Sequence, residues 1–284
     1  MTRRVAVVTD STASLPPDLV ERHGLAVAPL HVVLDGREGA EGVDVWPADV
    51  RRVLAARGGR VSTSRPSPVE LAEVYREAAE RAGVSAVVAV HLSGELSGTV
   101  EAARLAASSL GDLDVRVVDT GVIAMGLGFC AVAAAVAAAD GADPDEVATA
   151  ALRRAEGAAV LFYADTLEHL RRGGRIGSAA HLLGTALAVK PLLHVVDGEI
   201  RLLEKVRTSG RALQRLEEIA VERAGDDSVD VAVHQFGAED RARVLEERLR
   251  RRIPDMRSLR VLEVSAAVAA HTGPGSLGVV VSRR

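Results

Sequence analysis

Hydroxyl side chains gather in three short segments in the first half of this 284-residue chain, and they are the residues best suited to bind an anion. The segments are Asp10–Thr12, Ser62–Pro68 and Ser93–Thr99, and each follows an apolar run or precedes a helical pattern. Serine, threonine and aspartate at such junctions often cap helices by accepting backbone N–H groups. We interpret Asp10 and Ser67 as caps of this kind.

The third segment has glycines near Ser97, at the start of an expected helix. Gly94 and Gly98 leave the backbone bare there, and bare N–H groups at a helix N-terminus attract anions. We therefore predict an anion site at this loop, with Ser93 and Gly94 as additional ligand contacts. A phosphate group would suit the loop as well as a carboxylate.

A late glycine-rich segment contains the other candidate, His271. It runs from His271 to Gly278 between two extended patterns, and its three glycines and one proline predict a constrained loop that exposes the imidazole. Imidazole can donate a hydrogen bond to a carboxylate, more strongly when it is charged. A structural histidine in a tight turn fits the residues equally well.

Two adjacent glycines lie among three arginines in the segment Leu170–Gly177. Such a run could grip phosphate or form a docking surface. A solvated helix end would account for the first two arginines, but less readily for the Gly-Gly-Arg-Ile-Gly run. Further positive charge follows at Lys190–Leu193 and Lys205–Thr208, where solvated strand ends are an equal alternative.

Known catalytic patterns are missing. The sequence has no Walker loop, no dinucleotide fingerprint after its first strand, no nucleophile elbow and no second aspartate two residues after Asp10. His31, His181, His194 and His234 stand singly, so we interpret them as structural. We expect no catalytic residue, no metal and no cofactor.

Composition narrows the class of protein. The chain is 48% hydrophobic and 26% charged with a net charge of −4, and mixing of its basic and acidic residues argues against nucleic-acid binding. The lone Cys130 and the absence of a signal peptide indicate a reducing, cytoplasmic location. The uncharged stretch Val122–Ala139 is rich in alanine and favours a buried helix over integral membrane association. Aromatic residues make up only 2%, so an apolar cavity would be mainly aliphatic.

Apolar runs alternate with helical patterns in the first half, which predicts a doubly wound parallel α/β domain over residues 1–157. The expected strands are Arg4–Thr9, Leu25–Leu34, Val84–His91 and Val115–Asp119. The expected helices are Pro16–His23, Pro47–Arg57, Pro68–Ala82, Ser97–Leu110, the alanine-rich stretch and Pro144–Glu156.

The second half, residues 158–284, has Asp197-Gly198 between two extended runs, a hairpin signal that implies a mixed sheet. We predict a second α/β domain, with a ligand site between the two. Its expected strands are Ala158–Tyr163, Val189–Val196, Glu199–Lys205, Val229–His234, Leu259–Val264 and Leu277–Val281. Its expected helices are Leu167–Arg172, Ala179–Leu187, Gly210–Ala224 and Glu239–Arg252.

Several of these motifs, in this order, resemble the DegV family, the fatty-acid-binding subunits of the bacterial fatty acid kinase system. The resemblance spans nearly the whole chain. The motifs are Val7–Thr12, Thr63–Ser67, His91–Ser93 leading to Leu96–Thr99, Gly173–Ile176, Lys190-Pro191, Lys205–Thr208 and His271–Gly275.

The resemblance implies a long-chain fatty acid in an apolar tunnel between two α/β domains. A separate kinase subunit would transfer the γ-phosphate of ATP to the bound carboxylate, and the acyl phosphate would feed phospholipid synthesis. The region of Arg175 and Arg207 resembles the surface that meets this kinase. The residues that match those holding the carboxylate are Thr63, Ser64, Ser97 and His271.

Two positions depart from the family pattern. Arg65 stands where glutamine is usual, and Gly94 where a second serine is usual. Arg65 could place a cation near the carboxylate. The alternative to a fatty-acid carrier is an enzyme or sensor that binds a small phosphorylated metabolite such as a sugar phosphate. Acyl chain length, unsaturation and oligomeric state do not follow from the sequence.

Overall fold

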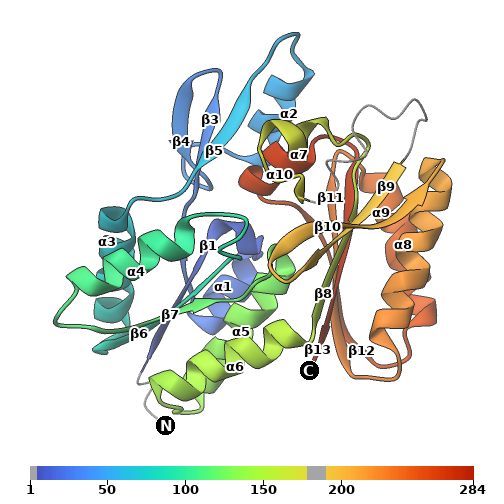
Figure 1. Cartoon of the computed structure of the whole chain (residues 1–284). Coiled ribbons are helices and arrows are strands. Elements are labelled where there is room, and N and C mark those ends of the chain that lie inside the picture. Colours follow the sequence, from blue (N-terminus) through green and yellow to red (C-terminus); the bar gives the residue numbers. More distant parts are fainter. Residues whose placement is uncertain (1–4, 178–189) are drawn as a thin grey trace.

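The computed structural model describes residues 5–177 and 190–284, which form an α/β structure with three sheets (Figure 1). The helix predicted at Ala179–Leu187, His181 and the first residue of the strand predicted from Val189 lie outside the described residues. In the described part of the chain, no helix is long and apolar enough to cross a membrane.

A four-stranded parallel sheet occupies the first half and confirms the predicted doubly wound arrangement. Successive valines and alanines point to opposite faces of the sheet because side chains alternate along a strand, so both faces are apolar. One face packs on α3 and α4 and the other on α5 and α6. The strand order is β2 (Ala26–Ala28), β1 (Ala6–Asp10), β6 (Ala86–His91), β7 (Asp114–Asp119), and the helices are α3 (Pro68–Ala82), α4 (Thr99–Ser109), α5 (Met125–Ala139) and α6 (Pro144–Glu156).

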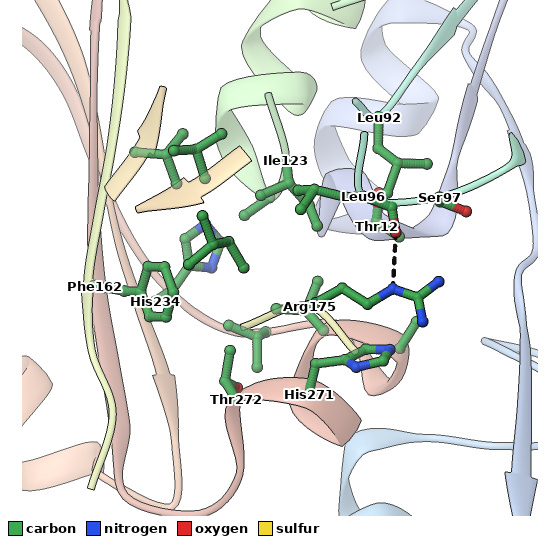
Figure 2. Close-up of a pocket in the computed structure, with 18 of the residues that line it drawn as sticks. Thr12, Leu92, Leu96, Ser97, Ile123, Phe162, Arg175, His234, His271 and Thr272 are labelled. Carbon is green, nitrogen blue, oxygen red and sulfur yellow. Dashed lines mark hydrogen bonds between the residues drawn. The ribbon is translucent and has the colours of Figure 1, made fainter. Parts of the chain in front are cut away.

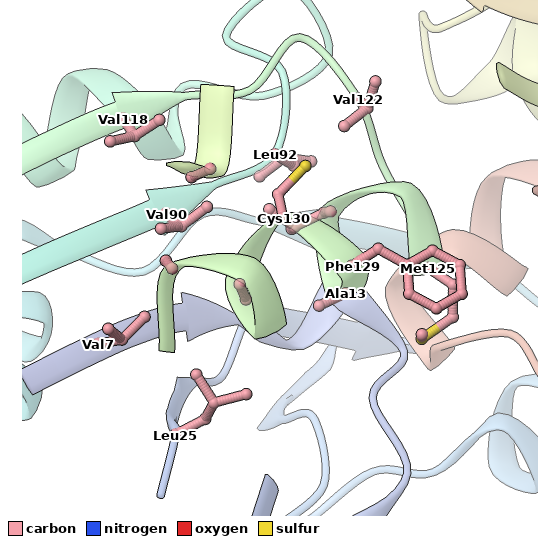
Figure 3. Close-up of a cluster of buried hydrophobic side chains, with 14 of the residues drawn as sticks. Val7, Ala13, Leu25, Val90, Leu92, Val118, Val122, Met125, Phe129 and Cys130 are labelled. Carbon is pink, nitrogen blue, oxygen red and sulfur yellow. The ribbon is translucent and has the colours of Figure 1, made fainter. Parts of the chain in front are cut away.

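Helix α5 is the alanine-rich stretch, and it is buried on nearly all sides. Small side chains let it lie close to the sheet, with Met125 and Phe129 filling the larger gaps among valines and leucines (Figure 3). Cys130 is buried in the same cluster, and burial raises the pKa of its thiol to about 12. The thiol is therefore protonated and unreactive at neutral pH.

A six-stranded mixed sheet fills the second half, as predicted. The hairpin at Asp197-Gly198 pairs Glu199 with Val196. One face carries α8 and α9, and the other faces α5 and α6. The strand order is β10 (Glu199–Val206), β9 (Lys190–Val196), β8 (Ala158–Tyr163), β13 (Ser276–Arg283), β11 (Val229–Phe236), β12 (Met256–Glu263), and the helices are α7 (Glu168–Arg172), α8 (Ser209–Ala224) and α9 (Glu239–Arg252).

The apolar core runs across the two halves. Val160, Leu193 and Val280 of the mixed sheet belong to one buried cluster with Val7 and Val90 of the parallel sheet. The division into domains at 157/158 coincides with the start of β8 and stays a prediction.

A third, antiparallel sheet was not predicted. It joins β4 (Arg37–Ala40), β3 (His31–Leu34) and β5 (Val61–Ser64), and α2 (Pro47–Ala55) connects β4 to β5. Two short helices, η1 (Ser11–Ala13) and α1 (Pro17–His23), precede this sheet in the chain. The single strand predicted at Leu25–Leu34 is wrong. Pro29 interrupts it, so β2 joins the parallel sheet and β3 joins the small one.

Helix α10 (Ala266–Thr272) corrects a second prediction, because His271 lies in the last turn of a helix and does not follow an extended segment. Ser265 caps the helix by accepting from Val268 N–H at 3.2 Å. Four alanines of α10 are buried. Three of them, Ala266, Ala267 and Ala269, share one apolar cluster with residues from the first part of the chain, namely Leu30, Val32 of β3 and Val50 of α2.

Candidate functional site

A cavity of about 300 Å³ lies where the carboxyl ends of β1 and β6, the inner face of the mixed sheet and helix α10 meet. This volume is at the lower end of the range for ligand pockets. Most of the wall is aliphatic, as the composition predicted for an apolar cavity. Its apolar side chains include Leu30, Leu92, Leu96, Ile123, Val160, Leu161, Phe162, Leu170, Val195, Ile200, Val264, Val268 and Val280.

One part of the wall is polar, and it gathers residues that are far apart in the sequence. Thr63 and Ser64 come from the end of β5, Ser97 from the loop before α4, and His271 from the end of α10. The four residues assigned to a carboxylate by resemblance all line this one cavity. Their role in binding stays a prediction.

Thr63 and His271 are in direct contact. The Thr63 Oγ1 and His271 Nε2 atoms are 2.8 Å apart, which joins the small sheet to α10. Burial, aided by the nearby Arg175 guanidinium, lowers the pKa of His271 to about 4, so the ring is neutral at pH 7. The hydroxyl of Ser64 donates to the Glu38 carboxylate on the neighbouring surface.

The glycine pair between the arginines has a packing role that the sequence did not reveal. A Cβ on Gly173 would lie 2.0 Å from His271 Nδ1, so only glycine leaves room for the imidazole at this position. Gly273 meets His169 in the same way, with a Cβ position 2.1 Å from His169 Cδ2. The two glycine-rich motifs therefore pack against each other's histidines.

Ser97 lies in a loop that is fixed from two sides. Its Oγ is 2.9 Å from Thr99 Oγ1 and accepts from Thr99 N–H at 3.3 Å. Arg175 Nε donates to the carbonyl oxygen of Leu96 at 3.0 Å, the dashed line in Figure 2. Arg175 also lines the cavity, so its cationic group lies at the polar end.

Arg65 lines the cavity mouth and is exposed. Its Nη1 donates to Gly98 O at 3.3 Å and to Glu101 Oε2 at 2.9 Å. A Cβ on Gly98 would lie 2.0 Å from this nitrogen, so the glycine makes room for the guanidinium. The cation expected from Arg65 is thus partly neutralised by Glu101.

Ser93 and Gly94 are not among the described residues that line the cavity. The buried Ser93 hydroxyl donates to Gly198 O at 2.7 Å, which ties the loop to the β9–β10 hairpin. Gly94 N–H lies 3.2 Å from both oxygens of Asp119 and donates to that carboxylate. These groups are used inside the protein, which weakens the case for an anion site built on this loop's backbone.

The two arginines assigned to kinase docking lie in different surroundings. Arg175 is half-buried at the cavity wall, whereas Arg207 is exposed in the short connection between β10 and α8 and does not line the cavity. Asp10 and Ser67 are confirmed as caps, since they accept from Thr12 N–H at 3.1 Å and Glu70 N–H at 3.2 Å.

Among the residues that line the cavity, sequence reasoning did not assign Thr12, His234 or Gly278 to the ligand. His234 was interpreted as structural, and its Nε2 does accept from Met125 N–H at 3.2 Å. Figure 2 shows it beside Phe162, on the side of the cavity away from Ser97. A polar residue within the apolar strand Val229–His234 was the only signal that could have singled it out.

The aliphatic cavity of this α/β structure ends in hydroxyls, an imidazole and a guanidinium, an arrangement whose chemistry suits an amphipathic ligand. A family model described as an uncharacterised protein of the DegV family matches residues 4–284, and the chain belongs to that family. A DegV domain-containing protein of Streptomyces coelicolor is 55% identical over 284 residues, which cover 100% of both chains.

Solved structures agree with this assignment. A DegV family protein from Thermus thermophilus, reported for its fatty acid binding, is 34% identical with a TM-score of 0.91, and covers 99% of this chain and 100% of its own. DegV from Bacillus subtilis, described as a fatty acid binding protein, is 30% identical with a TM-score of 0.90 and the same coverage. Both of these solved structures are described as binding fatty acids.

Proposed function

We propose that this protein binds one long-chain fatty acid, with its carboxylate held by Thr63, Ser64, Ser97 and His271 and its tail in the aliphatic part of the cavity. The observation that carries the proposal is the division of the cavity into one polar end and a long apolar wall. A small phosphorylated metabolite would leave that apolar wall unused, so we do not favour it.

Energetics supports this orientation. Burial of each acyl CH₂ contributes about 0.8 kcal/mol, so the tail supplies most of the affinity. An unpaired buried carboxylate is costly, and each hydrogen bond to it contributes roughly 1.5–3 kcal/mol. A neutral His271 can donate one such bond, and Arg175 adds a cation without a carboxylate partner among the described ion pairs. The tail fixes whether a ligand binds and the polar end fixes its direction.

We further propose that the protein carries the fatty acid as the substrate of a separate, cytoplasmic, ATP-dependent kinase subunit. The carboxylate oxygen would attack the γ-phosphate, with the reaction catalysed by the partner and the acyl phosphate passed to phospholipid synthesis. Held by hydroxyls and one imidazole, the carboxylate keeps an oxygen free to react. Arg207, exposed outside the cavity, is the better placed of the two arginines for docking.

Denaturing mass spectrometry of the protein purified from cells tests the binding step. We expect a co-purified long-chain fatty acid at close to one per chain. Absence of such a lipid, together with no uptake of added palmitate or oleate in a thermal shift assay, would overturn the proposal.

Charge reversal at Arg207 tests the docking step. With the kinase present, Arg207→Glu should lower acyl phosphate formation while fatty-acid affinity stays unchanged. Arg104→Glu, at an exposed position on α4, is the matched control. Equal rates for the two variants would exclude Arg207 from the docking surface.

A further inference from the structure

Glu41 is a buried carboxylate outside the cavity lining, next to the first turn of α10, where Ala267 forms part of the cavity wall. It follows β4 and is 8% exposed, and no cation among the described residues pairs with it. An acidic side chain without a cationic partner is rarely buried unless several donors surround it. The groups around the Glu41 carboxylate must therefore supply the hydrogen bonds that stabilise it.

Among the described residues, every hydrogen-bond partner of the Glu41 carboxylate is a donor, and these donors come from two other parts of the chain. Ser11 Oγ donates to Oε2 at 2.6 Å, and Ala267 N–H donates to Oε1 at 3.2 Å. Burial raises the pKa of Glu41, and hydrogen bonds from Ser11, Ala267, Ala266 and Ser265 oppose that rise. The ionised form, which only accepts hydrogen bonds, matches this set of donors.

These partners connect the segments that form the cavity wall. Ser11 follows β1, and its Oγ accepts from Leu30 N–H at 2.9 Å, just before β3. Ala267 is in the first turn of α10, whose last turn presents His271. The N-terminal end of α10 is thus fixed by Glu41, while Thr63 contacts its C-terminal end at 2.8 Å. Both contacts come from the small antiparallel sheet or the residue after it.

We infer that Glu41 is a positioning residue, whose carboxylate holds helix α10 so that His271 meets both Thr63 and the bound carboxylate. A seven-residue helix is short and stiff, so a shift at Ala267 carries to His271. The negative charge also lies at the N-terminus of α10, where the helix dipole favours it. This role rests on the proposed function only for the identity of the ligand, because the contact between His271 and Thr63 does not require a ligand.

The test compares binding of a fatty acid with binding of its methyl ester, which has the same tail but cannot be an anion. Glu41→Ala should lower the acid-over-ester preference about tenfold, the effect of one hydrogen bond to a charged group. Glu41→Gln keeps one oxygen to accept from Ala267 N–H and should stay within about threefold of wild type. Val45→Ala, at a nearby buried position, is the control for lost packing and should weaken acid and ester equally.

The imidazole NMR signals of His271 in the ligand-free protein give a readout independent of any lipid. They should shift in Glu41→Ala, stay near their wild-type positions in Glu41→Gln, and not move in Val45→Ala. If Glu41→Ala does not fold, Ser11→Ala removes one donor and should shift the same signals in part. Unchanged His271 signals and an unchanged acid-over-ester ratio in a folded Glu41→Ala would overturn the inference. A wild-type protein with no acid preference, but with shifted His271 signals in Glu41→Ala, would instead refute the proposed carboxylate site.

Discussion

The two ends of the cavity each contain a buried histidine, and the two rings differ mainly in their neighbours. Burial lowers the pKa of both His271 and His234 to about 4. Each ring has its Nε2 in a hydrogen bond, and neither Nδ1 has a partner among the described residues. At His271 the neighbours are Thr63 and Arg175, whereas His234 lies beside Phe162 and pairs across the sheet with Gly278.

The comparison shows that a neutral buried imidazole does not by itself make a carboxylate site. Hydroxyl groups and a guanidinium surround His271, so a charged headgroup finds donors on several sides there. At His234 the surroundings are aliphatic or aromatic, and a charge would be desolvated without compensation. The ligand direction that we propose rests on this difference, and four experiments test it.

The largest expected effect comes from filling the tail end. Gly278 has no side chain and lies in the sheet between His234 and Phe162. A Cβ at this position would lie 3.4 Å from Phe162 Cβ and 3.8 Å from His234 Cβ. Gly278→Leu should lower palmitate affinity at least ~100-fold, because four displaced methylenes cost about 3 kcal/mol. Octanoate, measured by the same calorimetry, should lose far less.

Gly278→Ala controls for the backbone contact with Leu161 O at 3.2 Å. An equal loss of affinity for the short and the long acid in Gly278→Leu would place the tail elsewhere.

The next effect concerns the polar end. Thr63→Val or Ser97→Ala should each lower the preference for palmitate over its methyl ester by about tenfold, since a hydrogen bond to a carboxylate is worth roughly 1.5 kcal/mol or more. Ser62→Ala, an exposed neighbour on β5, should leave the preference unchanged. Competition binding with a fluorescent fatty acid measures both ligands. Identical acid-to-ester ratios in all three variants would contradict the carboxylate assignment.

Acid should destabilise the ligand-free protein through both histidines. Their folded pKa of about 4 lies below the unfolded value near 6.5, so the unfolded state binds more protons and stability falls as pH drops from about 6.5 toward 4. At about pH 5.5 each ring should cost roughly 1.4 kcal/mol relative to pH 8. Urea unfolding at several pH values measures this loss.

Palmitate should remove the part due to His271, because a nearby carboxylate raises that pKa, and should leave the part due to His234. His271→Gln and His234→Gln should each flatten the pH dependence of the ligand-free protein. A ligand that protects both histidines equally would show that the two ends are not distinct.

The smallest effect concerns Arg175. Arg175→Gln should weaken palmitate binding by about threefold, given that a partly exposed charge contributes less than about 1 kcal/mol. It should also raise the pKa of His271, since the guanidinium lowers it. Histidine NMR titration measures that shift, with the exposed Arg172→Gln as control. If the pKa of His271 is the same in both variants, Arg175 does not act on the polar end of the cavity.

Local patterns predicted much of the fold. A proline at the start and a glycine after the end mark α3 at Pro68–Ala82, whereas acidic residues in the first turn and arginines in the last turn mark α9 at Glu239–Arg252. The small sheet escaped prediction because Arg37–Ala40 is polar and short, and because its pairing joins segments that only the tertiary structure aligns.

The site was predictable only in part. Hydroxyls and one histidine stand out in a sequence, and the structure gathers them in one cavity. Glu41, His234 and Gly278 carry no local signal that separates function from structure, since an acid after a polar strand, a lone histidine and a glycine in a strand have common structural explanations. Their importance comes from contacts across long sequence separations, which periodicity does not encode.

The small sheet has a consequence for how the protein is made. Residues 30–64 leave the ribosome well before α10, yet their buried side chains pack against this helix. Until then Leu30 and Val32 lack the apolar surface that covers them in the finished fold. The polar end of the cavity is therefore completed only after α10 has been translated, and a nascent chain that lacks α10 cannot hold a fatty acid in the proposed orientation.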